Sequence, residues 1–315
     1  MSEIGYFLSS EEHAPSALVD YARQAEEAGF TSVWISDHYH PWTDRQGQAS
    51  FVWSVIGGIA ATTGLRVTTA VTCPTVRLHP AVVAQAAATA SMMLDGRFQL
   101  GVGTGENLNE HILGDHWPPT DIRLEMLEEA VEVMRALWEG GSLTHRGRHY
   151  RVENARIYSL PEAAVPVYVS AFGPKAMSVA ARIGEGYVGT SPDGDLIRRY
   201  RDEGGQGPTQ AGMKVCWAAD EAAARRTAAE LWAHTAVPGE LSQELPMPAH
   251  FEQVSAMVTE EQVAGKVVCG PDPERHLEMI QKYLDAGYDE VYISQVGHDQ
   301  AGFFDFYQRE LVPRL

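Results

Sequence analysis

The segment Thr31-Ser-Val-Trp-Ile-Ser36-Asp37-His38-Tyr39-His40-Pro41-Trp42 joins a strand to a cluster of chemically active side chains. Its first half is rich in β-branched and aromatic residues, which is typical of a buried strand. An acid, two imidazoles and an indole follow, and Pro41 prevents the strand from continuing. Because α/β folds place their chemistry at the carboxyl ends of strands, we predict an α/β fold with a site at this point.

The segment belongs to a regular alternation of predicted strands and helices. A strand covers Ile4-Gly-Tyr-Phe-Leu-Ser9, and a helix follows from Pro15 until Gly29 ends it. Eight strand–helix units in 315 residues predict one domain, 1–315, folded as a closed (β/α)8 TIM-type barrel. The other strands are predicted at 31–37, 65–72, 97–103, 166–171, 186–191, 212–218 and 290–296, and further helices at 51–63, 80–94 and 123–139.

An internal repeat is consistent with a closed barrel. Ala28-Gly-Phe-Thr-Ser-Val-Trp-Ile-Ser36 and Ala286-Gly-Tyr-Asp-Glu-Val-Tyr-Ile-Ser294 share a helix end, an aromatic residue and a strand. Quasi-equivalent barrel units would produce such a repeat. A common sequence for ending a helix explains it as well, so both readings stay open.

Two segments interrupt the alternation. Residues 141–165 predict a small hairpin excursion. Residues 237–265 are rich in Pro and Glu, and they predict a lid-like insertion at the carboxyl-terminal mouth of the barrel.

Composition excludes several classes of function. The net charge of -18 argues against binding to nucleic acid or to an anionic membrane. Three widely spaced cysteines form neither a disulfide framework nor a metal motif, and no His-rich partner such as HExxH follows His38 and His40. With no leader and no long apolar run, we expect a soluble, cytoplasmic protein without a metal.

Two further constellations follow predicted strands. Gly101-Val-Gly-Thr-Gly-Glu106-Asn-Leu-Asn109-Glu110 has three alternate glycines that permit close backbone approach, but neither the Rossmann nor the P-loop pattern. Glu106 suits general acid chemistry there. In Val167-Tyr-Val-Ser-Ala-Phe172-Gly173-Pro174-Lys175, the start of a helix offers free amides to an anion, although plain helix initiation explains it equally. Taken singly, Asp37 is explained as a helix cap, His38 as a core histidine and Trp42 as packing.

Together these residues resemble a known family. Asp37-His38-x-x-Pro41-Trp42, Thr69-Ala-Val-Thr-Cys-Pro-Thr75 with His79-Pro80, and Gly103-Thr-Gly-Glu106-Asn-Leu-Asn109-Glu110 resemble the luciferase-like monooxygenase superfamily. The likeness is greatest to its branch of glucose-6-phosphate dehydrogenases that use the deazaflavin coenzyme F420. It covers essentially the whole chain, to Gly297-His-Asp-Gln300 and the final Leu311-Val-Pro-Arg-Leu315.

The resemblance implies residue roles. His38 is the acid/base facing the substrate oxygen, Trp42 shields the reacting centre, and Glu106 is the second proton donor or acceptor. Asp37 contacts the deazaflavin, and a non-prolyl cis peptide at Ala70-Val71 supports the ring. The phosphate and tail of F420 are held by Asn109, Phe172 and Gly173.

The chain departs from this pattern around the substrate. The resemblance assigns Cys73, Thr190 and Lys266 to the substrate, but Asp193 stands where the sugar-phosphate enzymes have a lysine, and residues 227–265 contain no Lys or Arg. A phosphate without paired charge is poorly held. We therefore expect a small neutral alcohol, ketone or activated alkene, for which the insertion offers an apolar set: Leu245, Met247, Phe251 and Met257.

Three alternatives remain from the sequence. One is an FMN-dependent luciferase-like monooxygenase, another a sugar-phosphate dehydrogenase with a rebuilt phosphate site, and the third a non-catalytic binding barrel. The joint presence of His38 and Glu106 argues against the third. The resemblance further implies a homodimer.

Overall fold

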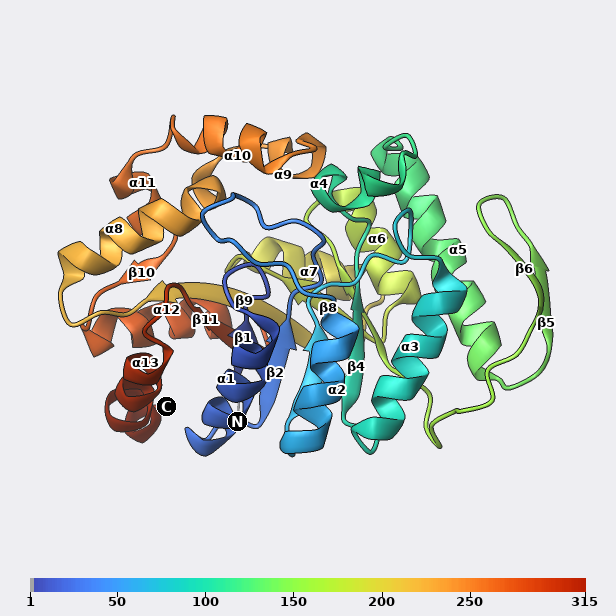
Figure 1. The fold of residues 1–315 in the computed structure, drawn as a ribbon, viewed down its shortest axis with the longest axis horizontal. Helices are drawn as coiled ribbons and strands as arrows, with labels where there is room; N and C mark the ends of the chain where they lie inside the picture. The colour runs from blue at the N-terminus through green and yellow to red at the C-terminus, as the bar shows by residue number, and fades with distance from the viewer. Residues whose placement is uncertain (1–2) are drawn as a thin grey trace.

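Eight parallel strands close into a barrel surrounded by helices in the computed structural model, which describes residues 3–315 (Figure 1). β1 pairs with β11, with Tyr6 opposite Ile293, and the pairing of Tyr187 in β8 with Thr209 in β9 completes the ring. The predicted TIM-type barrel is confirmed. Its strands are β1 (Glu3–Leu8), β2 (Ser32–Ile35), β3 (Arg66–Thr69), β4 (Phe98–Val102), β7 (Val167–Ser170), β8 (Gly186–Gly189), β9 (Thr209–Cys216) and β11 (Glu290–Gln295).

Helices cover the outside of the barrel, and local chemistry sets their ends. Pro15 opens the first helix, and Gly29 follows its end with a φ of 99°. Gly287 adopts the same left-handed conformation before β11, with a φ of 101°, so the two copies of the internal repeat have the same backbone turn. The main helices are α1 (Pro15–Glu27), α2 (Val52–Thr62), α3 (Pro80–Met93), α5 (Thr120–Trp138), α6 (Pro174–Ile183), α7 (Gly194–Asp202), α8 (Glu221–Trp232), α12 (Pro273–Asp285) and α13 (Gln300–Phe306).

The barrel strands are buried on both faces. Val33 and Ile35 of β2 pack outward into the main core, whereas Trp34 between them points into the barrel. There the Trp34 ring stacks on Tyr292 with a centroid separation of 4.5 Å, and its Nε1 donates to Gln210 Oε1 at 3.0 Å. The near-continuous apolar runs that predicted these strands follow from this double burial.

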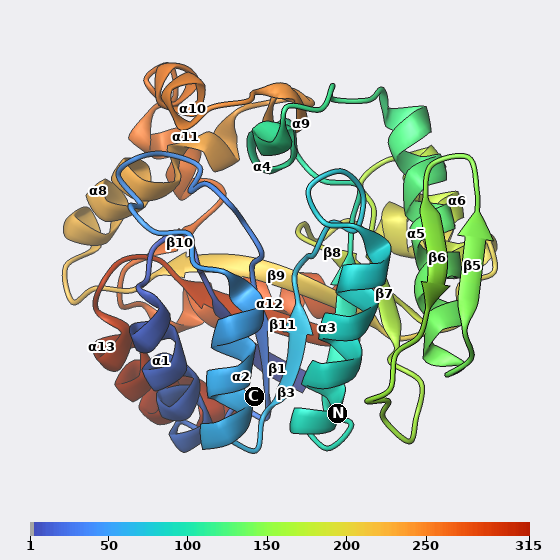
Figure 2. The same ribbon diagram turned by 45° about the vertical axis from the view of Figure 1, so that its right-hand side comes forward.

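The excursion at 141–165 contains an antiparallel hairpin of β5 (Leu143–Arg146) and β6 (Arg151–Ala155), as predicted. It lies outside α5 (Figure 2). The Glu129 carboxylate of α5 accepts hydrogen bonds from the amides of His149 at 2.9 Å and Tyr150 at 2.8 Å. The hairpin is therefore fastened to the barrel wall, away from the mouth.

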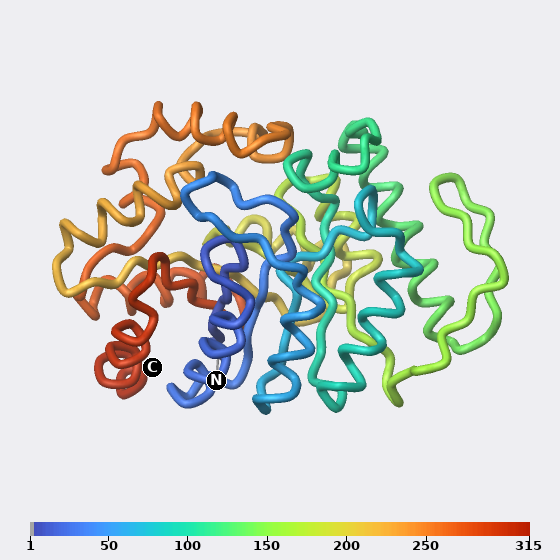
Figure 3. Tube along the Cα trace, in the orientation of Figure 1, coloured from blue at the N-terminus to red at the C-terminus, as the bar shows by residue number. Residues whose placement is uncertain are grey.

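The insertion at 237–265, called the lid below, is helical. It contains α9 (Leu241–Glu244), α10 (Pro248–Ser255) and α11 (Glu260–Ala264), which lie above the side of the barrel where the strands end (Figures 1 and 2). Of these, α9 lies beside α4 (Asn107–Glu110) and α11 beside α8. This confirms the predicted position at the carboxyl-terminal mouth. The chain ends on the opposite side, where β1 begins (Figure 3).

Several boundaries differ from the sequence prediction; for example, β3 ends at Thr69 rather than 72, and α5 begins at Thr120 rather than 123. The seventh barrel strand begins at Thr209 rather than 212, because Thr209-Gln-Ala-Gly lacks an apolar signal. A two-residue strand, β10 (Val268–Cys269), also pairs with the end of β9 and is too short to leave a periodic pattern.

Candidate active site

The residues predicted to form a site leave the same end of the barrel. His38 follows β2, Val71 follows β3, Glu106 follows β4 and Gly173 follows β7. Hydrogen bonds join the first three loops: Thr72 Oγ1 donates to Asp37 Oδ2 at 2.7 Å, and Asn109 Oδ1 accepts from the amide of Tyr39 at 2.9 Å. Parallel strands explain why segments so distant in sequence meet at one mouth.

His38 faces a buried carboxylate that the sequence argument missed. Its Nδ1 lies 3.4 Å from Glu11 Oε1, and the two side chains are 10% and 3% exposed. Glu11 Oε2 also accepts from Ser36 Oγ at 2.7 Å and Ser9 Oγ at 2.8 Å. Burial alone would raise the pKa of Glu11, but the His38 imidazole and these hydrogen bonds outweigh it, and the pKa is lowered. Glu11 is therefore an anion beside the imidazole.

Trp42 lies between His38 and the lid. Its ring is 5.0 Å from the His38 ring and stacks on His234 at 4.8 Å. It also meets Phe251 of α10 edge-on at 5.2 Å. Of the apolar residues predicted in the insertion, Phe251 is 1% exposed and packs against Trp42, whereas Met257 is 82% exposed and Met247 45% exposed.

Asp37 belongs to a buried ion-pair network. Arg77 Nη2 donates to Asp37 Oδ1 at 2.9 Å, and Arg77 Nε lies 3.6 Å from Glu110 Oε1. Glu110 Oε2 accepts from the amide of Arg77 at 2.7 Å, and burial raises the pKa of Glu110 to about 7. Arg77 was not predicted, although it lies between the two quoted segments Thr69–Thr75 and His79–Pro80.

Glu106 and Asn109 lie on either side of the first turn of α4. Glu106 is the half-buried N-cap residue, and its Oε2 lies 3.5 Å from Asn109 Nδ2. Asn109 is 1% exposed, and its Oδ1 also accepts from the amide of His40 at 3.1 Å. Asn109 therefore fixes the loop after β2, whatever ligand it also meets.

A second cluster lies at the carboxyl ends of β1 and β9. Burial raises the pKa of Glu12 to about 7, and its carboxylate accepts from Trp232 Nε1 at 2.6 Å and from the Gly297 amide at 2.8 Å. Lys214 Nζ lies 4.0 Å from the centroid of the Trp232 ring, and burial lowers its pKa against the opposing attraction of Glu11 and Glu12. The rule that located Asp37, polar residues at a strand end, also applies to Glu11 and Glu12.

Two glycines after β4 allow close packing within the protein. A Cβ on Gly103 would lie 2.8 Å from Val71 Cγ2 at the end of β3, and a Cβ on Gly105 would lie 2.7 Å from Glu110 Cγ. At the end of β3 the Ala70–Val71 peptide bond is cis, as predicted, and both residues are half-buried. Cys73 beside them is 4% exposed, and burial raises the pKa of its thiol well above the usual value.

The remaining predicted positions differ in their surroundings. Phe172 is 53% exposed. Gly173 is the N-cap residue of α6, so no side chain caps the first amides of this helix. The Thr190 carbonyl accepts from Tyr283 Oη at 3.1 Å. Asp193 Oδ1 caps α7 by accepting from the amide of Asp195 at 2.9 Å, and Lys266 is exposed.

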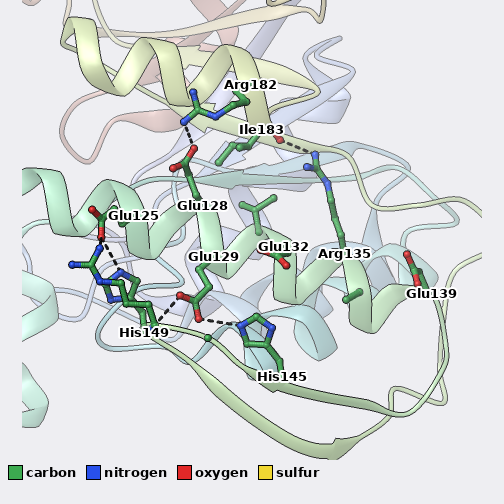
Figure 4. A pocket seen from close by; sticks show the side chains of 14 residues that line it. Glu125, Glu128, Glu129, Glu132, Arg135, Glu139, His145, His149, Arg182 and Ile183 are labelled. Carbon is green, nitrogen blue, oxygen red and sulfur yellow. Dashed lines mark hydrogen bonds and ion pairs between the residues drawn. The ribbon is translucent and has the colours of Figure 1, made fainter.

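A groove on the outside of the barrel has a volume of about 760 Å³ and lies between α5, the hairpin and the end of α6 (Figure 4). Its charges are largely paired: Glu129 with His145, and Glu128 with Arg182. It is remote from His38. Across residues 3–315, no group of three or more acidic, His or Cys side chains has the geometry of a metal site. No helix in this range is both long and apolar enough to span a bilayer.

Comparisons with known proteins identify the family and match the barrel fold. The model of the luciferase-like monooxygenase family matches residues 1–290, and the chain belongs to this family. The F420-dependent glucose-6-phosphate dehydrogenase of Nocardia farcinica is 37% identical over 332 aligned positions, which cover 99% of this chain and 98% of that protein. The enzyme of the same name from Microbacterium testaceum is 37% identical, covering 99% and 96%.

Solved structures show the same architecture. An F420-dependent secondary alcohol dehydrogenase, in complex with an F420–acetone adduct, superposes with a TM-score of 0.91 at 28% identity, covering 98% of both chains. The coenzyme F420-dependent tetrahydromethanopterin reductase of Methanopyrus kandleri has a TM-score of 0.79 at 20% identity, covering 99% of both chains, and supports the fold alone.

Proposed function

We propose that this protein is an F420-dependent oxidoreductase that transfers a hydride between the coenzyme and a small neutral alcohol, ketone or activated alkene. The observation that carries the proposal is the His38–Glu11 pair beside Trp42 at the mouth, with Glu106 on the neighbouring loop. Full-length relatives named as F420-dependent dehydrogenases support the choice of coenzyme.

The residues at the mouth suit a flat ring with an anionic tail. Ala70 and Val71 pack on the inner barrel cluster and keep part of their surface open, as a support for a ring requires. The amino-terminal end of α6 has no side-chain cap, and a Cβ on Gly173 would meet nothing within 4 Å. Free amides facing open space are suited to a phosphate. Ala70, Val71, Asp37, Asn109, Phe172 and Gly173 would hold the coenzyme.

The chain's own groups manage the protons. When bound, F420 accepts or supplies two electrons as a hydride. In the oxidative direction His38 removes the hydroxyl proton of the substrate, and Glu11 at Nδ1 orients the ring and stabilises the imidazolium. Glu106 donates or accepts the second proton, and Trp42 with Phe251 excludes water. In the reductive direction the same groups act in reverse.

The charges at the mouth favour a neutral substrate. Asp193 caps α7 by accepting a hydrogen bond from the Asp195 amide. The position where the sugar-phosphate enzymes have a lysine therefore carries an acid with a structural role. Both cations described at the mouth already face carboxylates: Lys214 faces Glu11 and Glu12, and Arg77 is paired with Asp37 and Glu110. Cys73, Thr190 and Lys266 remain proposed substrate residues. A sugar phosphate therefore lacks the paired charges that it needs.

The experiment is a substrate screen with purified protein and F420, in which reduction of the coenzyme is followed by its absorbance. We expect the highest kcat/KM with a neutral alcohol. The alternative of a rebuilt phosphate site predicts glucose-6-phosphate as the best substrate instead, and the monooxygenase alternative predicts turnover only with reduced FMN and oxygen.

Assembly and location are part of the same proposal. α2 and α3 contain no charged residue, and α3 exposes Val82 by 56% and Met93 by 48% on one face. A second copy of the chain would cover this apolar face in a homodimer. Light scattering at micromolar concentration tests this.

The three buried cysteines are unpaired, in keeping with the cytoplasm.

A further inference from the structure

The helix α4 makes contacts with two loops of the active site. Asn109 binds the amides of the loop after β2, and the Leu108 carbonyl lies 2.8 Å from His40 Nδ1. Glu110 binds the amides of the loop after β3, through Val76 at 3.3 Å and Arg77 at 2.7 Å. The position of this single turn therefore depends on both loops.

The lid makes a third contact with α4. Asn107 Nδ2 donates to the Glu244 carbonyl of α9 at 2.9 Å. The position of α4 relative to the lid thus depends on a side chain adjacent to Glu106.

Arg123 of α5 contacts the same lid helix, α9, through Gln243 and Glu244. Its side chain is 1% exposed, and its guanidinium lies 4.3 Å from the centroid of the Trp117 ring. Nη2 donates to Gln243 Oε1 at 3.0 Å, and Nη1 donates to the Pro118 carbonyl at 2.8 Å. A buried guanidinium is stable only when acceptors surround it. The lid supplies one of them through Gln243, and Glu244 forms an ion pair with Arg123 at 3.5 Å.

We propose that Asn107 and Arg123 are positioning residues that couple the seating of the lid to the placement of Glu106. Glu106 is the N-cap of α4, and its carbonyl accepts from the amides of Asn109 at 3.0 Å and Glu110 at 3.1 Å. The hydrogen bond from Asn107 to the Glu244 carbonyl adds the lid to the two loops that already fix α4. Without the contact to the lid, α4 would be fixed by the loops after β2 and β3 only, and the Glu106 carboxyl would be less precisely placed. This inference rests on the role of Glu106 proposed above.

The test is a double-mutant cycle between Asn107→Ala and Glu106→Gln. Loss of one neutral hydrogen bond corresponds to about a fivefold change, so Asn107→Ala should lower kcat by about fivefold and leave the Kd of F420 within twofold. In the Glu106→Gln background, Asn107→Ala should cause no further loss of kcat, because its effect acts through Glu106.

Two further variants make the test complete. Gln243→Ala removes an acceptor of Arg123 from the lid side and should show the same lack of additivity, even if Asn107→Ala fails to fold. Gln262→Ala disrupts the capping box of α11, elsewhere in the lid, and should leave kcat within twofold.

The outcomes separate this inference from the proposed function. If Asn107→Ala or Gln243→Ala lowers kcat by the same factor in both backgrounds, the inference is wrong and the role of Glu106 stands. Wild-type kcat in both variants also overturns the inference alone. If Glu106→Gln has wild-type kcat, the proposed role of Glu106 fails, and the inference fails with it.

Discussion

Replacing Glu11 by Gln should impair catalysis without removing any group that touches the substrate. Glu11 is 3% exposed and lies 3.4 Å from His38 Nδ1, so the imidazolium that forms during alcohol oxidation is stabilised by a carboxylate largely shielded from water. His38 Nδ1 makes no hydrogen bond in this structure, and we expect the contact to become a charge-assisted hydrogen bond when the imidazole is protonated. Such a bond contributes about 1.5–3 kcal/mol, and about 1.4 kcal/mol is one factor of ten. We therefore expect kcat/KM to fall by roughly 10- to 150-fold.

The assay is steady-state reduction of F420 by the best alcohol from the screen. Ser9→Ala removes one hydrogen bond to the same carboxylate and should cost about fivefold. Glu129→Gln is the matched control, because Glu129 is also a largely buried carboxylate that binds a histidine and backbone amides, but it lies outside the barrel. The control should lose stability and keep kcat. Wild-type kcat/KM in Glu11→Gln would show that the pair is structural only.

Three further predictions concern catalysis, specificity and stability. His38→Ala and Glu106→Gln should each lower kcat by roughly 100- to 10,000-fold, as is usual for lost acid/base groups, while the Kd of F420 measured by titration stays nearly constant; activity within a few-fold of wild type would place the proton chemistry elsewhere. Glucose-6-phosphate should have a kcat/KM on the order of 100-fold or more below that of the best neutral substrate, since two charge-assisted contacts are missing; equal values would refute this. Because the pKa of Glu12 is raised to about 7 in the folded protein, its contribution to stability is complete below its unfolded pKa and is lost as the pH rises towards 7. Denaturant unfolding should show the free energy of unfolding falling by about 3 kcal/mol between pH 4.5 and 7.5 in wild type and by less in Glu12→Gln; parallel curves would contradict it.

The sequence predicts the barrel well because its signals are local. In β2, apolar residues face both the outer core (Val33 and Ile35) and the barrel interior (Trp34). The ends of α1 are set by Pro15 and Gly29. The shorter elements could not be predicted in this way. α4 has four residues and β10 has two, and neither is long enough to show a period.

The candidate site could be predicted only in part, because several of its contacts join segments that are distant in sequence. Asp37 and His38 stand out at a strand end, but the partner of His38 is Glu11, 27 positions earlier in the chain. Lys214 lies inside a strand, where its sequence neighbours give no sign of the mouth. The position of the lid was predicted correctly. The exposure of the Met257 side chain shows, however, that apolar residues in an insertion need not face the pocket.

Titration of the purified, coenzyme-free protein with F420 and, separately, with FMN tests the central claim most directly. The free amides of α6 and the open surface at Ala70 and Val71 predict saturable binding of F420 with a Kd in the micromolar range or tighter, which corresponds to about -8 kcal/mol or better. We expect much weaker binding of FMN. Equal or tighter binding of FMN, together with FMN-dependent turnover, would contradict the account.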